Sequence, residues 1–256
     1  MTALREHIFG RRVGADRMFR WRGAEVSRLE GLSDGVFALT ITLLVVSVQV
    51  PSTFFELWQS FRELPVFLVC FVLLMWAWRY HYLFFRRYGL EDLPTTVLNG
   101  VFLFLVLFYA YPIKFVATFL WHLSIGVDVR PLFAVPEGVA FASSLGQRVD
   151  MMLLYGVGFV GVFGSLAALS AWAYHRRAEL ELDALERYLT RASIVTLLIT
   201  VGIAILSVLI VLSTGRPDFG GIVYFLMGPA HGVWGYVAGA RARRIELAMA
   251  AEGSAG

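Results

Sequence analysis

Residues 28–50, with the sequence RLEGLSDGVFALTITLLVVSVQV, place charged and hydroxyl-bearing side chains at the start of an apolar segment of membrane-spanning length. Arg28, Ser33 and Asp34 are costly next to lipid, so we expect them to have protein partners. Beyond them, apolar side chains recur at helical spacing on one face, with hydroxyl groups beside it. The apolar positions are Leu39, Leu43, Val46 and Val50, and the hydroxyl positions are Thr40, Thr42 and Ser47. The pattern predicts a helix that faces something other than lipid.

The composition excludes an ordinary soluble domain. Apolar residues make up 58% of the 256 residues, charged residues make up 16%, and the mean hydropathy is +0.69. A helix needs about 20 apolar residues to cross the hydrocarbon core of a bilayer. We therefore expect an all-α membrane protein with six transmembrane helices per chain. The predicted spans are residues 32–50, 65–85, 97–120, 151–174, 192–213 and 219–240.

Arginine placement predicts the orientation of these spans, because short loops rich in Lys and Arg stay on the cytoplasmic side. Arginines precede the first span, close the second, lie between the fourth and fifth, and follow the last. We expect a multi-pass protein of the inner cell membrane with both termini cytoplasmic. Residues 1–31 then form a basic cytoplasmic arm, residues 32–240 the transmembrane domain, and residues 241–256 a cytoplasmic tail. The net charge of +3 reflects this topology and not nucleic-acid binding.

The connections between the spans carry weaker signals. Prolines and glycines in residues 121–150 predict an irregular external loop, and the charges and leucines of residues 175–191 predict a cytoplasmic extension of the fourth or fifth helix. Tyr111 and Pro112 predict a kink or an end in the third span. Glycines in residues 156–164 provide small faces for close helix approach.

Motifs for enzymatic chemistry are absent from the sequence. It has no P-loop, dinucleotide fingerprint, HExxH pair or G-x-S-x-G elbow, and no Cys/His spacing typical of a metal site. We expect neither an enzyme nor a bound cofactor. His231 is the one ionisable residue predicted near the middle of a span, and its simplest role is a hydrogen bond to a neighbouring helix. Such a scarcity of ionisable groups disfavours a proton-coupled transporter.

The first three spans resemble a known family. The sequence from Arg28 to Asp34 is similar to the RxxxFSD signature of the transmembrane protein 175 family of potassium channels, with Leu32 in place of its Phe. The continuation GVFALTITLL, the WRYH motif ending at His81 and the LNGVFLFL motif containing Asn99 also resemble the family pattern. The similarity is sharpest over residues 28–112.

The resemblance implies a homotetramer whose central pore is lined by the first helix of each subunit. The narrowest position corresponds to Leu39, followed along the helix by Thr42, Leu43, Val46 and Val50. Potassium is the implied permeant ion, and transient potassium in the pore is the only metal expected. A ring of branched apolar side chains favours potassium over sodium modestly, because potassium sheds water more easily, and it can close by dewetting.

The resemblance and the predicted depth of the residues also imply a hydrogen-bonded cluster at the cytoplasmic end of the first helix. Its members are Arg28, Ser33, Asp34, His81 and Asn99. The alternative is that Ser33 and Asp34 only cap the helix while Arg28 follows the positive-inside rule. A secondary transporter of a small solute or ion is the alternative function, a non-conducting scaffold is a third, and proton permeability through transient pore water is a further property to test.

Overall fold

The computed structural model describes residues 18–254, except residues 24, 47–50, 138–140 and 142. The chain folds into long helices joined by short connections. The long helices are α2 (Arg28–Val46), α4 (Leu64–Tyr88), α5 (Leu93–Ser124), α6 (Ser144–His175), α7 (Ala184–Thr214) and α9 (Met227–Ser254). The short ones are α3 (Phe54–Arg62), the 3₁₀ turns η2 (Arg130–Phe133) and η3 (Tyr224–Leu226), and α8 (Pro217–Val223).

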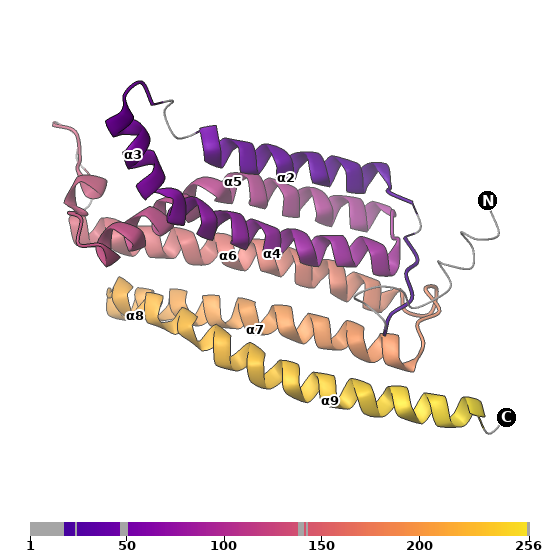
Figure 1. Cartoon of the computed structure of the whole chain (residues 1–256). Helices are drawn as coiled ribbons and strands as arrows, with labels where there is room; N and C mark the ends of the chain where they lie inside the picture. Colours follow the sequence, from indigo (N-terminus) through magenta and orange to yellow (C-terminus); the bar gives the residue numbers. More distant parts are fainter. Residues whose placement is uncertain (1–17, 24, 47–50, 138–140, 142, 255–256) are drawn as a thin grey trace.

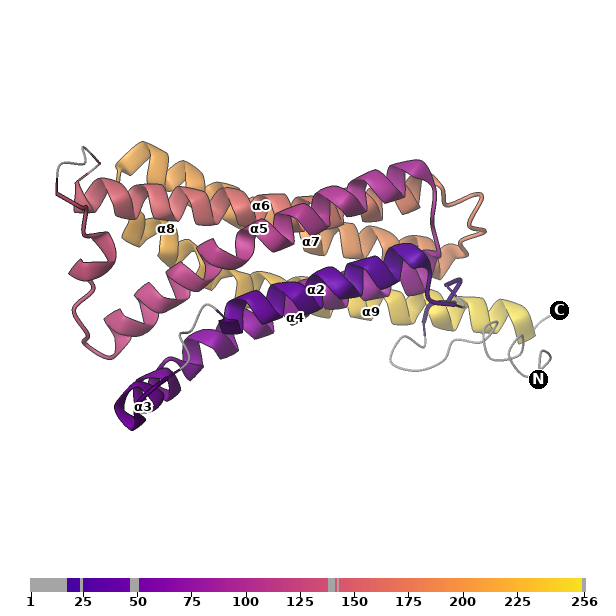
Figure 2. The ribbon, with the colours of Figure 1, turned by 90° about the horizontal axis from the view of Figure 1, so that it is seen from above.

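The long helices run side by side in an elongated bundle (Figure 1). Helix α6 packs between α5 and α7, α2 packs on α4 and α5, and α9 packs on α7. The view from above shows α2 along one edge of the bundle, with α3 turned away at its far end (Figure 2). The start of α2 and the end of α9 lie at the same end of the bundle, as an even number of crossings requires (Figure 1).

Four of the described helices are long and apolar enough to cross a membrane, namely α4, α5, α6 and α7. Together they account for four of the six predicted spans. Helix α2 has Arg28, Glu30 and Asp34 in its first two turns, and α9 continues into the charged sequence after Ala240. The chain is an all-helical, multi-pass membrane protein.

Local sequence explains where the helices begin and end. Asp92 and Ser143 cap α5 and α6 by accepting a hydrogen bond from the backbone N–H three residues on, and Asp183 forms a capping box with Glu186 at the start of α7. Helix α4 ends at Gly89, whose φ of 57° lies in the left-handed region that glycine adopts without strain.

The structure moves several of the predicted boundaries. The first helix begins at Arg28 instead of residue 32. Of the two outcomes predicted at Pro112, a kink or an end, the end is wrong, because α5 continues through Pro112 to Ser124. Of the extension predicted in residues 175–191, only residues 184–191 are helical as part of α7, because α6 ends at His175 and residues 176–183 form the turns that connect the two helices. The last predicted span is interrupted: α8 and the η3 turn precede α9, which continues to Ser254.

Glycines allow α6 to approach both of its neighbours closely. A Cβ atom on Gly156 would lie 2.4 Å from a methyl group of Val208 on α7, and one on Gly158 would lie 2.3 Å from the ring of Tyr109 on α5. Tyr109 is buried, and its hydroxyl donates a hydrogen bond to the carbonyl oxygen of Tyr155. The predicted small face of α6 is therefore confirmed at Gly156 and Gly158, whereas a Cβ atom on Gly164 would meet no neighbour within 4 Å.

Gly158→Ala should destabilise the protein by about 1–3 kcal/mol, because the Tyr109 ring must leave its packed position. Gly164→Ala is the matched control, since a Cβ atom there meets nothing within 4 Å. Thermal unfolding in detergent should show a lower midpoint for the first variant alone. Equal midpoints for the two variants would contradict the packing argument.

Candidate functional site

Helix α2 has one face buried in its own subunit. Glu30, Ser33, Phe37, Thr40 and Leu44 follow one another at intervals of three and four residues, and each is buried. This face packs on α4 and α5. The buried polar groups on it need partners, because an unsatisfied polar group away from water is costly.

The opposite face of α2 is uncovered in a single subunit. Leu32 is 61% exposed, Leu39 is 50% exposed and Val45 is 49% exposed. Gly35, Ala38 and Thr42 lie between them and are also exposed, which gives a stripe that is apolar or small along the helix. Leu39 and Thr42 of the predicted pore residues belong to this stripe, and we call it the α2 stripe.

The other predicted pore positions lie beside or beyond the stripe. Leu43 is half-buried. Val46 is the last residue of α2, and its side chain lies outside the described residues, as does Val50 altogether.

Thr42 lies on the α2 stripe with its hydroxyl hydrogen-bonded to the helix backbone. Its hydroxyl donates a hydrogen bond to the carbonyl oxygen of Ala38, at 2.9 Å. The proton is therefore used within the helix, and the oxygen lone pairs remain for another group. Thr40 makes the same bond to Val36 at 2.8 Å, but it is fully buried.

The structure joins three of the five predicted cluster residues in one hydrogen-bonded chain. The Asn99 Oδ1 atom lies 2.9 Å from His81 Nε2, its Nδ2 donates to Ser33 Oγ at 3.0 Å, and Ser33 Oγ donates to the Leu29 carbonyl at 2.8 Å. This order requires the proton of His81 to be on Nε2. All three side chains are buried, and the His81 ring stacks on Phe102 with centroids 5.4 Å apart.

The other two predicted members lie apart from this chain. Asp34 is exposed and accepts a hydrogen bond from Trp78 Nε1 at 3.0 Å, which still connects α2 to α4. Arg28 is exposed and has no hydrogen bond or ion pair with any residue that the structure describes. The cluster as predicted is therefore too large: Ser33, His81 and Asn99 meet, Asp34 is held separately, and Arg28 is not part of it.

Glu30, which was not among the predicted cluster residues, makes the charged contact at the start of α2. Its carboxylate accepts a 2.7 Å hydrogen bond from Arg86 on α4, and the side chains of both residues are mostly buried. The sequence signal was an acidic residue two positions after Arg28, paired with an arginine at the end of the next helix.

Residues 19–23, which we call the strap, cross the same end of the bundle just before α2. Arg20 and Arg22 both bind the carboxylate of Glu186 on α7, which is fully buried. The shortest of these contacts are 2.9 Å from the Arg20 backbone N–H and 2.7 Å from Arg22 Nη2. The strap therefore ties the start of α2 to α7.

The strap also lies directly on α4. The backbone N–H groups of Arg22 and Gly23 donate to the carbonyl oxygen of Arg86 at 3.0 and 3.2 Å. A Cβ atom on Gly23 would lie 2.4 Å from the carbonyl oxygen of Phe85, so only glycine permits this approach. Arg86 thus contacts the strap through its carbonyl oxygen and through Nη1, which donates to the Gly23 carbonyl oxygen at 3.0 Å, and it contacts α2 through Nη2.

Glu186→Gln should destabilise the protein by about 2–4 kcal/mol, because it leaves two arginines beside a buried neutral amide. Glu179→Gln is the control, since Glu179 is largely exposed and pairs with Arg176, where the loss should be under about 1 kcal/mol. Thermal unfolding in detergent measures both variants. An unchanged midpoint for Glu186→Gln would show that the strap is not a stabilising contact.

The far end of α2 is held by a lysine. Lys114 on α5 donates a 3.2 Å hydrogen bond from Nζ to the carbonyl oxygen of Leu44, in the last turn of α2. A positive charge at a helix C-terminus is favourable.

Glu56 and Glu63, near the end of the bundle where α3 lies, both have partners within the protein. Glu56 accepts hydrogen bonds from the backbone N–H groups of Ser52 and Thr53 as part of the capping box of α3. Glu63 lies 2.8 Å from His122 Nε2 on α5. Both carboxylates are thus engaged at the end of the bundle where α3 lies.

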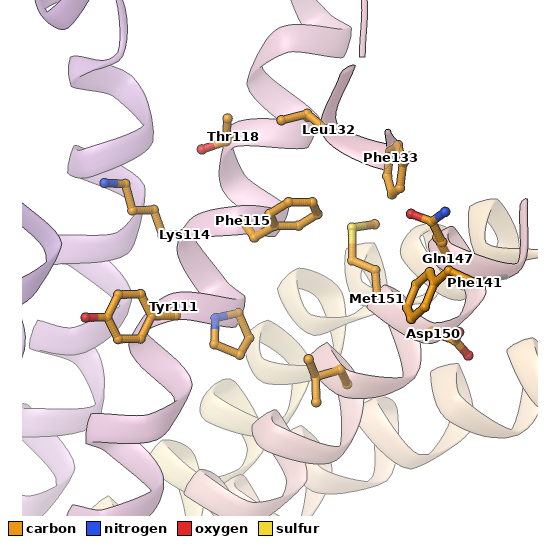
Figure 3. A pocket seen from close by; sticks show the side chains of 12 residues that line it. Tyr111, Lys114, Phe115, Thr118, Leu132, Phe133, Phe141, Gln147, Asp150 and Met151 are labelled. Atoms are coloured by element: carbon orange, nitrogen blue, oxygen red, sulfur yellow. The ribbon is translucent and has the colours of Figure 1, made fainter. Parts of the chain in front are cut away.

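A cavity lined mainly by α5 and α6 lies outside the α2 stripe. It has a volume of about 740 Å³, and its walls include Phe115, Phe133 and Met151 (Figure 3). Lys114 lines its edge but extends away from Met151 and Phe133 on the other side of α5 (Figure 3). Because its walls are mostly apolar, the described residues of this cavity do not form a catalytic or metal-binding cluster.

His231 makes the contact that we predicted for it. Its Nε2 lies 3.0 Å from the hydroxyl of Thr200 on α7. Trp234, one turn further along α9, donates to the Thr196 hydroxyl at 3.1 Å. The pair attaches α9 to α7 and leaves His231 with a structural partner.

Comparisons with known proteins agree with one another. Residues 28–109 match the family described as endosomal/lysosomal potassium channel TMEM175. A potassium channel of Marivirga tractuosa is 35% identical over 246 residues, covering 93% of this chain and 98% of that protein. A potassium channel of Chamaesiphon minutus is 34% identical over 110 residues, covering 39% of this chain and 53% of that protein.

A solved structure is similar over nearly the whole fold. It is the crystal structure of a variant of the potassium channel MtTMEM175 in complex with a Nanobody-MBP fusion protein, which is 34% identical and superposes with a TM-score of 0.76. The match covers 89% of this chain and 99% of that one. The family match over residues 28–109 includes α2 and all three residues of the buried hydrogen-bonded chain.

Proposed function

This chain belongs to the TMEM175 family of potassium channels, and we propose that four copies assemble around a central potassium pathway lined by α2. It is a prokaryotic-type family member, a membrane channel and not an enzyme. The comparisons thereby favour a channel over the secondary transporter that the sequence left as an alternative.

The α2 stripe is the observation that carries this proposal. One face of α2 is buried against α4 and α5, whereas the other exposes leucine, valine, glycine and threonine along its described length. Small residues such as Gly35 and Ala38 allow helices to approach one another closely. Symmetric copies of α2 facing one axis would cover the stripe and enclose a narrow passage.

Leu39 forms the constriction in this proposal, with Thr42 one turn beyond it. Leu43 stands beside the axis, and Val46 and Val50 continue the lining toward the external side. A ring of leucine side chains makes an ion shed part of its hydration shell, which costs potassium less than sodium. The Thr42 oxygens offer lone pairs just past the ring, because their protons are donated to Ala38.

Selectivity from such a ring should be modest. An apolar constriction has no array of carbonyl oxygens to replace the lost water, so it discriminates through the cost of dehydration. Sodium is therefore a minor permeant ion in this proposal, and protons are a further one through transient water. The same ring closes by dewetting when the side chains approach.

We infer six membrane crossings, with α2 and the α8–α9 unit as the first and last. Both termini then lie on the cytoplasmic side of the inner membrane, with residues 1–31 as the basic arm and residues 241–256 as the tail. Arg86, the arginines of the strap and Arg176 at the end of α6 all lie at this end of the bundle. The positive-inside rule therefore supports a cytoplasmic location for this end. Ser33, His81 and Asn99 act there as a brace that fixes α2 on α4 and α5.

Leu39→Asn should reduce the preference for potassium over sodium toward unity, because an amide ring holds water in the constriction. Currents or potassium-dependent flux in liposomes with purified protein provide the measurement. Leu198→Asn on α7 is the control, as Leu198 is exposed to a similar degree but lies outside α2. Unaltered selectivity in Leu39→Asn would remove Leu39 from the pathway.

The assembly can be tested separately by cross-linking. With Cys70→Ala as background, Leu39→Cys should give oxidant-induced disulfides between subunits, because residues on a narrow axis lie within disulfide range. Leu198→Cys should stay unlinked, and native mass spectrometry of the background protein should show four copies. A monomer, or equal cross-linking of both variants, would contradict the arrangement.

A further inference from the structure

A second cavity, of about 500 Å³, lies between α5, α6 and α8. Its charged residues gather at one end of the bundle: Arg148 lies in the first turns of α6, and Asp218 lies in the first turn of α8. The deeper wall is apolar and aromatic, with Val116, Tyr155 and Phe225. We call this cavity the α8 groove.

Arg148 packs against two aromatic rings, and its Nε–H has no acceptor among the described residues. Its guanidinium carbon lies 5.7 Å from the ring centroid of Phe119 and 5.2 Å from that of Phe133. Its Nε–H is buried without a hydrogen-bond partner, and the guanidinium forms no ion pair with the residues that the structure describes. A partly buried cation without an acceptor is unfavourable, so an anionic group that reaches it gains a strong interaction.

Arg130, in the connection between α5 and α6, differs from Arg148 because it is exposed and has an ion-pair partner. Its side chain is 86% exposed and pairs with Asp128 at 2.9 Å. Asp218 on the other wall of the groove is exposed and has no hydrogen bond or ion pair with described residues. Arg148 and Asp218, which have no ion-pair partner among the described residues, thus lie above the apolar wall of the groove.

We propose that the α8 groove binds a phospholipid whose head group carries a primary ammonium, of the phosphatidylethanolamine type. The phosphate accepts hydrogen bonds from Arg148, the ammonium faces Asp218, and an acyl chain lies along Val116, Tyr155 and Phe225. Guanidinium recognises phosphate through several parallel donors, and the volume suits a small-molecule site. An apolar wall leading away from the charges favours a lipid over free phosphate. The site is independent of the pore assignment.

Native mass spectrometry of delipidated full-length protein provides the test. Phosphatidylethanolamine, phosphatidylglycerol and inorganic phosphate are added separately. Arg148→Gln should weaken phosphatidylethanolamine binding about tenfold, as expected for the loss of charge-assisted hydrogen bonds. Arg148→Lys should retain an intermediate affinity, and Arg130→Gln should be unchanged. Asp218→Asn should abolish the preference for the ethanolamine over the glycerol head group.

Several outcomes would overturn the proposal. Equal lipid binding by the original protein and Arg148→Gln would remove Arg148 from the site. Phosphate alone competing as well as the lipid would reduce the groove to an anion site. Loss of subunit association in Arg148→Gln, with lipid binding unchanged, would show that a second copy of the chain covers the groove. Arg148→Lys keeps the test decisive if the glutamine variant does not fold.

Discussion

The hydrogen-bonded chain from His81 through Asn99 to Ser33 is the interaction on which the placement of α2 depends. Asn99 satisfies groups on two other helices with one carboxamide, donating to Ser33 and accepting from His81. All three side chains are inaccessible to water, so a sliding or rotated α2 would leave buried polar groups without partners. Packing of apolar side chains alone would permit several registers. The polar chain selects one.

Charged contacts at the two ends of α2 help the hydrogen bonds among His81, Asn99 and Ser33 to hold α2 in place. Arg86 binds Glu30 at the first turn, and Lys114 binds the Leu44 carbonyl at the last. The strap adds a third connection, because its arginines reach Glu186 on α7. The face of α2 that carries these contacts is the buried one, and the α2 stripe is left free for other subunits. Helix α2 is thus fixed through its buried face, and its opposite face can contact other subunits.

The sequence predicted the helical class, the four apolar helices and the three residues of the buried chain, because composition and a distinctive motif depend on local order. It did not predict the partner of Glu30, nor the strap, because pairing between residues 56 and 164 positions apart leaves no local pattern. Pro112 predicted a kink or an end in the third span, but α5 continues through it to Ser124. The interruption at η3 has no signal beyond the glycines and the proline around it.

A constriction made of leucine places a particular demand on the rest of the protein. A carbonyl filter binds its ion directly, whereas an apolar ring has no directional bond to the ion, so its diameter depends on where the helix backbones stand. In the proposed assembly, the residues that determine discrimination by Leu39 are therefore those that position α2 and never touch the ion. Polar groups are stable in that role only if they are buried and paired, as Ser33, Asn99 and Glu30 are. The charged and polar side chains near the pathway then hold the α2 backbone in place, and Leu39 is the residue that meets the ion.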